Sequence, residues 1–121
     1  MELPAIRGLA VAFIGLFKGA LLMSYQSEFG EVIDALWDTI QKRKTADPEK
    51  SYTAYLLNAH EDKVLKKIGE ESAEVVMASK DGDRDHLRYE VGDLLYHTLV
   101  NCARHDIAPQ DIAEELRARF K

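Results

Sequence analysis

Residues 61–80 have the sequence EDKVLKKIGEESAEVVMASK, and this stretch decides the fold class because its apolar side chains recur at helical spacing. An α-helix turns once in about 3.6 residues. That period gives one arc, apolar except for a serine, made of Val64, Leu65, Ile68, Ser72, Val75 and Val76. The polar run KDGDRD follows, and its Gly82 suits a turn. The stretch therefore predicts a helix from about residue 61 to residue 80 that ends in a turn at Gly82.

A second helix is predicted from this turn to about His105. One arc of this segment holds Leu87, Val91, Leu94, Leu95, Thr98 and Cys102. Because only a short turn separates the two segments, we expect them to pack as an antiparallel helix hairpin.

The other segments also have helical patterns. Apolar side chains recur at spacings of three and four within residues 29–40, and a polar loop around Pro48 follows. A short segment begins at Ser51, and a last short helix is predicted over residues 109–119. No stretch after Met23 shows the alternation of a strand, so the predicted fold is all-α, an antiparallel hairpin with flanking helices.

The second helix of the hairpin is apolar on more than one side, since Tyr96, Leu99 and Val100 lie off its main arc. A helix of this kind needs more than one neighbour, and a chain of 121 residues offers few. We therefore expect a homodimer that completes the helical bundles.

Four carboxylates follow the edges of these arcs. Glu71 and Glu74 form a stripe on the first helix, and Glu90 and Asp93 form one on the second. Gly82 lies midway between Glu74 and Glu90, and also midway between Glu71 and Asp93. An antiparallel hairpin would therefore bring the four carboxylates together.

Such a cluster favours a bound cation. Two like charges about 5 Å apart repel by roughly 3 kcal/mol at an effective dielectric constant near 20. Carboxylate oxygens are ligands that Mg²⁺ prefers, and Mg²⁺ commonly binds substrate phosphates in the same site. The pattern predicts a magnesium site that hydrolyses a phosphate compound. The alternative is a solvated acidic face on a non-catalytic helical interaction module.

The pairs Glu71-x-x-Glu74 and Glu90-x-x-Asp93 resemble the metal-binding signature of the all-α nucleoside triphosphate pyrophosphohydrolase superfamily. The longer stretches SYTAYLL (residues 51–57), EDKVLKKIGEESAEVVMASK (residues 61–80) and EVGDLLYHTLV (residues 90–100) resemble the phosphoribosyl-ATP pyrophosphohydrolase family. This resemblance implies hydrolysis of phosphoribosyl-ATP to phosphoribosyl-AMP and pyrophosphate, the second step of histidine biosynthesis, by a cytoplasmic, Mg²⁺-dependent homodimer. A house-cleaning pyrophosphohydrolase of other nucleotides is the alternative within the superfamily.

The resemblance also implies roles for individual residues. The implied metal ligands are Glu71, Glu74, Glu90 and Asp93. The implied catalytic residues are Glu70 and Glu71, with Glu70 as an outer ligand or as the base that activates water. The implied substrate-binding residues are Ser51, Tyr52, Thr53, Lys63, Lys66 and Lys67.

The composition limits the compartment and the partners. The net charge of −5 argues against a nucleic-acid partner, because phosphate backbones require clustered positive charge. Cys102 is the one cysteine, so an intrachain disulfide is impossible and a reducing compartment, the cytoplasm, is expected. Leu9–Phe17 is an unbroken apolar run, but it falls short of the roughly 20 residues that span a bilayer.

The N-terminal residues differ in character from the rest. We expect residues 1–22 to be an apolar extension, contributed by an upstream start codon or by cloning, and residues 23–121 to form a single all-α domain. An apolar helix used in oligomer packing, or a signal for export, is the alternative for the extension.

Overall fold

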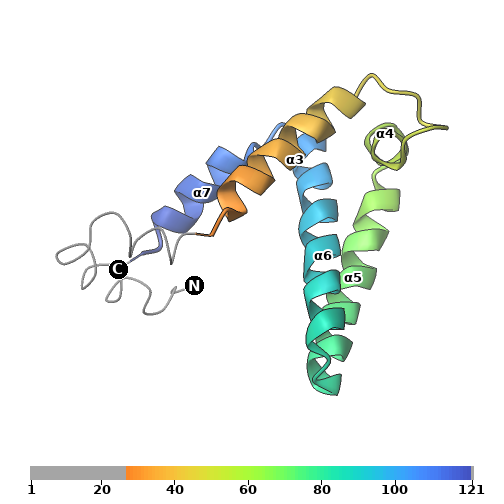
Figure 1. The fold of residues 1–121 in the computed structure, drawn as a ribbon. Helices are drawn as coiled ribbons and strands as arrows, with labels where there is room; N and C mark the ends of the chain where they lie inside the picture. Colours follow the sequence, from red (N-terminus) through yellow and green to blue (C-terminus); the bar gives the residue numbers. More distant parts are fainter. Residues whose placement is uncertain (1–26, 121) are drawn as a thin grey trace. The chain divides into compact units, whose positions relative to one another are not determined.

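The computed structural model describes residues 27–120, and their secondary structure is helical (Figure 1). The helices are α3 (Phe29–Arg43), α4 (Tyr52–Asn58), α5 (Asp62–Asp81), α6 (Arg84–Arg104) and α7 (Pro109–Arg117). No strand occurs within residues 27–120, which confirms the predicted all-α fold class. The predicted extension at residues 1–22 lies outside the described residues.

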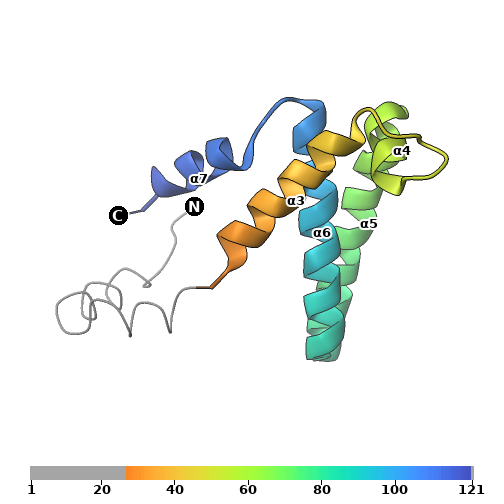
Figure 2. The same cartoon turned by 45° about the horizontal axis from the view of Figure 1, so that its top comes forward.

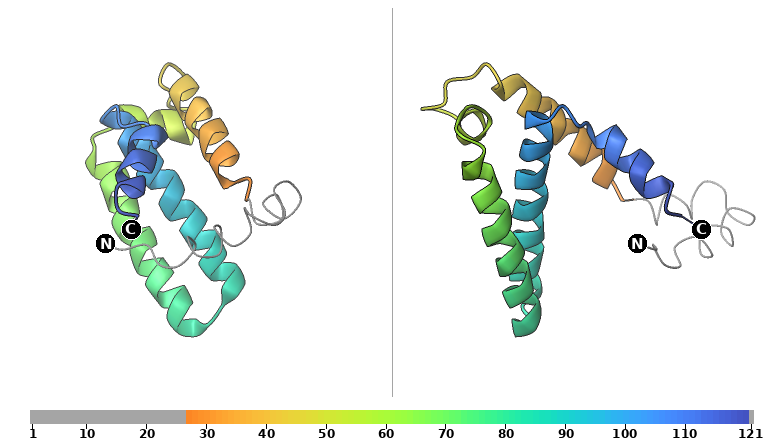
Figure 3. Two further views of the ribbon diagram at one scale, coloured as in Figure 1. Left: turned by 90° about the vertical axis from the view of Figure 1, so that its left-hand side faces the viewer. Right: turned by 180° about the vertical axis from the view of Figure 1, so that it is seen from behind.

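The predicted hairpin is formed by α5 and α6. Gly82 ends α5 in the left-handed region, with φ of 70°, a conformation that glycine adopts without steric cost. Asp83 then caps α6, since its side chain accepts a hydrogen bond of 3.0 Å from the backbone N–H of His86. The two helices therefore lie side by side and antiparallel, as the two views of Figure 3 show.

One carboxylate of each stripe, Glu71 on α5 and Glu90 on α6, is buried inside the hairpin. On α5 the buried residues are Val64, Glu71 and Ala78, which recur every seven positions, and on α6 Glu90 and His97 are buried with the same spacing. Seven residues are close to two helical turns, so each set forms one continuous stripe.

This arrangement corrects one expectation. Leu65 and Val76 belong to the arc that was predicted to face the core, yet their exposed fractions in the single chain are 42% and 61%. The physical reason is the position of α6, which packs over the stripe of Val64, Glu71 and Ala78 and leaves Leu65 and Val76 uncovered.

Helix α4 packs against α6 at the end of the hairpin opposite the α5–α6 turn (Figure 2). Ser51 caps it, since its hydroxyl accepts a hydrogen bond from the N–H of Ala54. At its other end the Nη1 atom of Arg104 donates to the carbonyls of Leu56, Leu57 and Ala59, at distances of 2.9, 3.0 and 2.8 Å. These bonds satisfy carbonyls that a helix end leaves without intrahelical partners. Arg104 therefore fixes α4 to α6.

The compact unit just described spans residues 36–108. A second unit contains residues 27–35 and α7 and is described by itself. Glu115 of α7 forms an ion pair of 2.7 Å with Arg119, which lies in the turn that follows α7. Within residues 27–120, no helix combines the length and the apolar character that crossing a bilayer requires.

Candidate active site

The hairpin brings carboxylates of both helices together. Glu71, Glu90 and Asp93 each offer an oxygen, and these atoms all lie within 4.8 Å of one another. Glu74 belongs to a second such group, with His86 and Glu90. The four predicted metal ligands thus lie in two overlapping groups that share Glu90, and whether they hold a metal stays a prediction.

Glu71 and Glu90 are strongly coupled. When Glu90 is protonated, it can share a hydrogen bond with Glu71. This bond and burial shift the pKa of both carboxyls. The hydrogen bond to Glu71, with burial next, raises the pKa of Glu90 above its ordinary value. The same hydrogen bond, assisted by Lys67, lowers the pKa of Glu71. The pair therefore holds a proton more readily than two separate carboxylates would.

A hard divalent cation fits this donor set. The Oε2 atom of Glu90 is buried and has no hydrogen-bond partner within the described part of the chain. A buried carboxylate oxygen without a partner is costly, and a cation would satisfy it. The donors of Glu71, Glu90 and Asp93 are all oxygens, which suits Mg²⁺.

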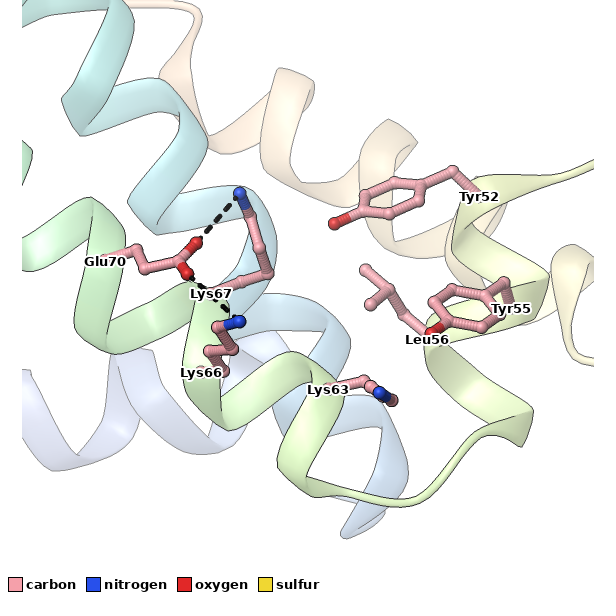
Figure 4. Close-up of a pocket in the computed structure, with 7 residues that line it drawn as sticks. All are labelled: Tyr52, Tyr55, Leu56, Lys63, Lys66, Lys67 and Glu70. Atoms are coloured by element: carbon pink, nitrogen blue, oxygen red, sulfur yellow. Dashed lines mark ion pairs between the residues drawn. The ribbon is translucent and has the colours of Figure 1, made fainter.

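A cavity of about 250 Å³ lies beside these carboxylates, between α4 and α5 (Figure 4). Its lining residues are Tyr52, Tyr55, Leu56, Lys63, Lys66, Lys67 and Glu70. Three lysines and one glutamate line it, so the cavity suits an anionic ligand. Its volume is close to the lower end of the roughly 300–1,000 Å³ that is typical of small-molecule sites.

Lys67 links the cavity to the carboxylates. Its Nζ atom lies 3.2 Å from Oε1 of Glu71 and 3.3 Å from Oε2 of Glu70. Among the described residues Lys66 pairs with Glu70 alone, at 3.8 Å, and both Glu70 pairs are drawn in Figure 4. The hydrogen bond to Glu71 raises the pKa of Lys67, so this side chain carries a positive charge at neutral pH.

The predicted residues at the start of α4 have different positions. Tyr52 lines the cavity, and its hydroxyl lies 3.1 Å from Nε2 of His97. The Thr53 hydroxyl bonds to the hydroxyl of Tyr96, and the Ser51 side chain caps α4. Ser51 and Thr53 are not among the lining residues of the cavity. Ser51 thus caps α4 and Thr53 bonds α4 to α6, and the role of both in substrate binding stays a prediction.

Comparison with known proteins identifies the family of this chain. The sequence profile described as Phosphoribosyl-ATP pyrophosphohydrolase matches residues 28–120. The chain belongs to this family. It is 53% identical over 88 residues to the phosphoribosyl-ATP pyrophosphatase of Nitrosomonas eutropha, covering 73% of this chain and 75% of the relative. It is 49% identical over 94 residues to that of Geobacter sulfurreducens, covering 78% of this chain and 87% of the relative.

Membership of the phosphoribosyl-ATP pyrophosphohydrolase family confirms the resemblance. Four residues near the site were not predicted from the sequence. Tyr55 and Leu56 complete the cavity wall, His86 joins Glu74 and Glu90, and Arg104 fixes α4. The spacing of four between His86 and Glu90 on one helix was a usable signal. No sequence signal points to Arg104, because its partners are backbone carbonyls, which every residue carries.

Proposed function

We propose that this chain hydrolyses phosphoribosyl-ATP to phosphoribosyl-AMP and pyrophosphate, with cleavage between the α and β phosphates, in the second step of histidine biosynthesis. The family match over residues 28–120 is the observation that carries this conclusion. The position of the lysine-lined cavity next to the buried carboxylates also supports it. A triphosphate needs both positive side chains and a cation site.

Glu71, Glu90 and Asp93, with Glu74 one helical turn further along α5, are the proposed Mg²⁺ ligands. When bound, Mg²⁺ neutralises phosphate charge and makes water more acidic.

The chain's own residues bind the substrate and move the proton. Lys63, Lys66 and Lys67 bind the phosphate oxygens in the cavity, and Tyr52 closes over the bound nucleotide. Lys67 offsets the charge of Glu71 at the point where the phosphates approach it. Glu70 lines the cavity and is the proposed base that accepts a proton from the attacking water.

We also propose a cytoplasmic homodimer that binds no nucleic acid. Apolar side chains on α5 and α6 support the dimer, since Val76, Met77 and Tyr89 are exposed in the single chain. Burial of this surface by a second copy would explain the open arc of α5. Light scattering on the purified protein measures the mass, and a monomer would contradict the proposal.

The deciding experiment is pyrophosphate release with Mg²⁺ from phosphoribosyl-ATP and from a panel of ordinary nucleoside triphosphates. We expect turnover of phosphoribosyl-ATP with kcat/KM at least about a hundredfold above the panel, a difference worth about 2.7 kcal/mol. Equal or better turnover of ordinary nucleotides would favour a house-cleaning enzyme. No turnover of any nucleotide by the folded protein would favour a non-catalytic module.

A further inference from the structure

His86 is the one nitrogen donor in the two groups of potential metal ligands found within residues 27–120. It lies on the first turn of α6, four residues before Glu90, and faces Glu74 on α5. Its Nε2 atom is 3.1 Å from Oε1 of Glu90 and 3.7 Å from Oε2 of Glu74. One ring nitrogen therefore approaches carboxylates of both helices.

These distances match the edges of a coordination shell. With metal–ligand bonds of about 2.1 Å, adjacent ligand atoms are roughly 3.0 Å apart in an octahedron and roughly 3.4 Å apart in a tetrahedron. The shorter separation is close to the octahedral value, and the longer one exceeds the tetrahedral value by about 0.3 Å, so a cation can bind between the donors with small side-chain movements.

A second observation points to a ligand here. The side chain of Glu90 is only 9% exposed, and its Oε2 atom has no hydrogen-bond partner among the described residues. The Oε1 atom of the same carboxyl is bonded to His86. A carboxylate with one oxygen beside a nitrogen donor and the other unsatisfied is suited to bind cations through both oxygens.

We propose that Glu74, His86 and Glu90 form a second cation site that takes a divalent transition metal such as Mn²⁺. Imidazole nitrogen favours first-row transition metals, whereas Mg²⁺ prefers oxygen donors alone. The site shares Glu90 with the proposed magnesium ligands Glu71 and Asp93. Like Glu90, Glu74 is shared with the proposed magnesium ligands.

Pulsed electron paramagnetic resonance on the Mn²⁺-loaded full-length protein, without substrate, tests the site. An imidazole ligand adds a ¹⁴N modulation to the Mn²⁺ signal. We expect this modulation in the wild type and in His60→Gln, a control at an exposed histidine outside both groups. We expect His86→Gln and His86→Leu to lack it. Their Mn²⁺ affinity should fall at least about tenfold, because losing even an outer-shell partner costs 10–100-fold.

Three results would overturn the site. They are a wild type that binds no Mn²⁺, a wild type without the ¹⁴N modulation, and a modulation that persists in both folded His86 variants. In each case His86 would act only as an ion-pair partner of Glu74 and Glu90. Because no substrate is present, these results are separate from failure of the proposed hydrolysis, which the pyrophosphate assay with Mg²⁺ measures.

Discussion

The hydroxyl of Tyr52 lies 3.1 Å from Nε2 of His97, whose Nδ1 lies 2.8 Å from the backbone carbonyl of Asp93. A carbonyl can only accept, so Nδ1–H donates to Asp93. In the neutral ring Nε2 then accepts from Tyr52. Burial raises the pKa of Tyr52 above its ordinary value of 10.0, so the phenol keeps its proton at neutral pH. The cavity wall is thus bonded to the helix that carries two proposed metal ligands.

Tyr52→Phe should lower kcat/KM about 3- to 10-fold, since a hydrogen bond of this kind contributes roughly 0.5–1.5 kcal/mol. Combining it with His97→Gln should cost less than the sum of the single changes, because both remove one interaction. Steady-state kinetics on the two single variants and the double variant measure the effect. Strictly additive losses would contradict the coupling.

The two adjacent lysines should differ in importance. Lys67 is a third exposed and contacts both Glu70 and Glu71, whereas Lys66 is three-quarters exposed and pairs with Glu70 alone. We expect Lys67→Met to lower kcat/KM about a hundredfold and Lys66→Met about tenfold or less, in line with weaker effects of exposed charges. Equal losses in the two variants would remove the special role of Lys67.

Arg104→Met should destabilise the fold by about 2 kcal/mol, because three carbonyls at the end of α4 lose a charged donor. Arg88→Met is the matched control, since Arg88 pairs with Asp85 on the surface, and it should change stability by under about 0.5 kcal/mol. Urea unfolding measures both. A similar stability for the two variants would show that Arg104 does not hold α4.

The coupled carboxyls predict a pH dependence for the metal-free protein. The pKa of Glu90 is raised above 4.5, so its stabilising contribution is present at lower pH and is lost as pH rises through the raised pKa. The lowered pKa of Glu71 acts in the opposite sense. The stabilising contribution of Glu71 to the folded state is lost only as pH falls below 4.5. Above pH 4.5 the Glu90 effect therefore applies.

Glu90→Gln should accordingly be more stable than the wild type near neutral pH in EDTA, and the difference should shrink as the pH falls towards 4.5. Thermal unfolding at a series of pH values measures it. Because Glu90 is also a proposed ligand, Mg²⁺ should stabilise the wild type and leave the variant unchanged. A stability difference that does not vary with pH would contradict the coupling of Glu71 and Glu90.

Much of the fold could be predicted because helical periodicity and one turn determine it. The spacing of carboxylates about Gly82 was sufficient to predict that Glu71 and Asp93 lie in one group. The pattern could not show which face of α5 meets α6, because the apolar arc and the carboxylate stripe are adjacent. Leu65 and Val76 were therefore assigned to the wrong side of the helix within the single chain.

Other parts of the site depend on contacts that no local pattern encodes. Arg104 reaches residues more than forty positions earlier in the chain, at Leu56 and Leu57. Tyr55 enters the cavity wall only because Arg104 and Ser51 set the orientation of α4. Long-range geometry of this kind follows from packing, and the spacing of residues along the sequence cannot predict it.

The carboxylates of the hairpin carry the central claim, and Mg²⁺-dependent pyrophosphate release from phosphoribosyl-ATP by Glu71→Gln and Asp93→Asn tests it most directly. Both changes keep the size of the side chain and remove its charge. We predict losses of at least about a thousandfold in kcat, at the upper end for removal of one stabilising group, with unchanged helix content by circular dichroism. Activity within about tenfold of the wild type in both folded variants would contradict the claim.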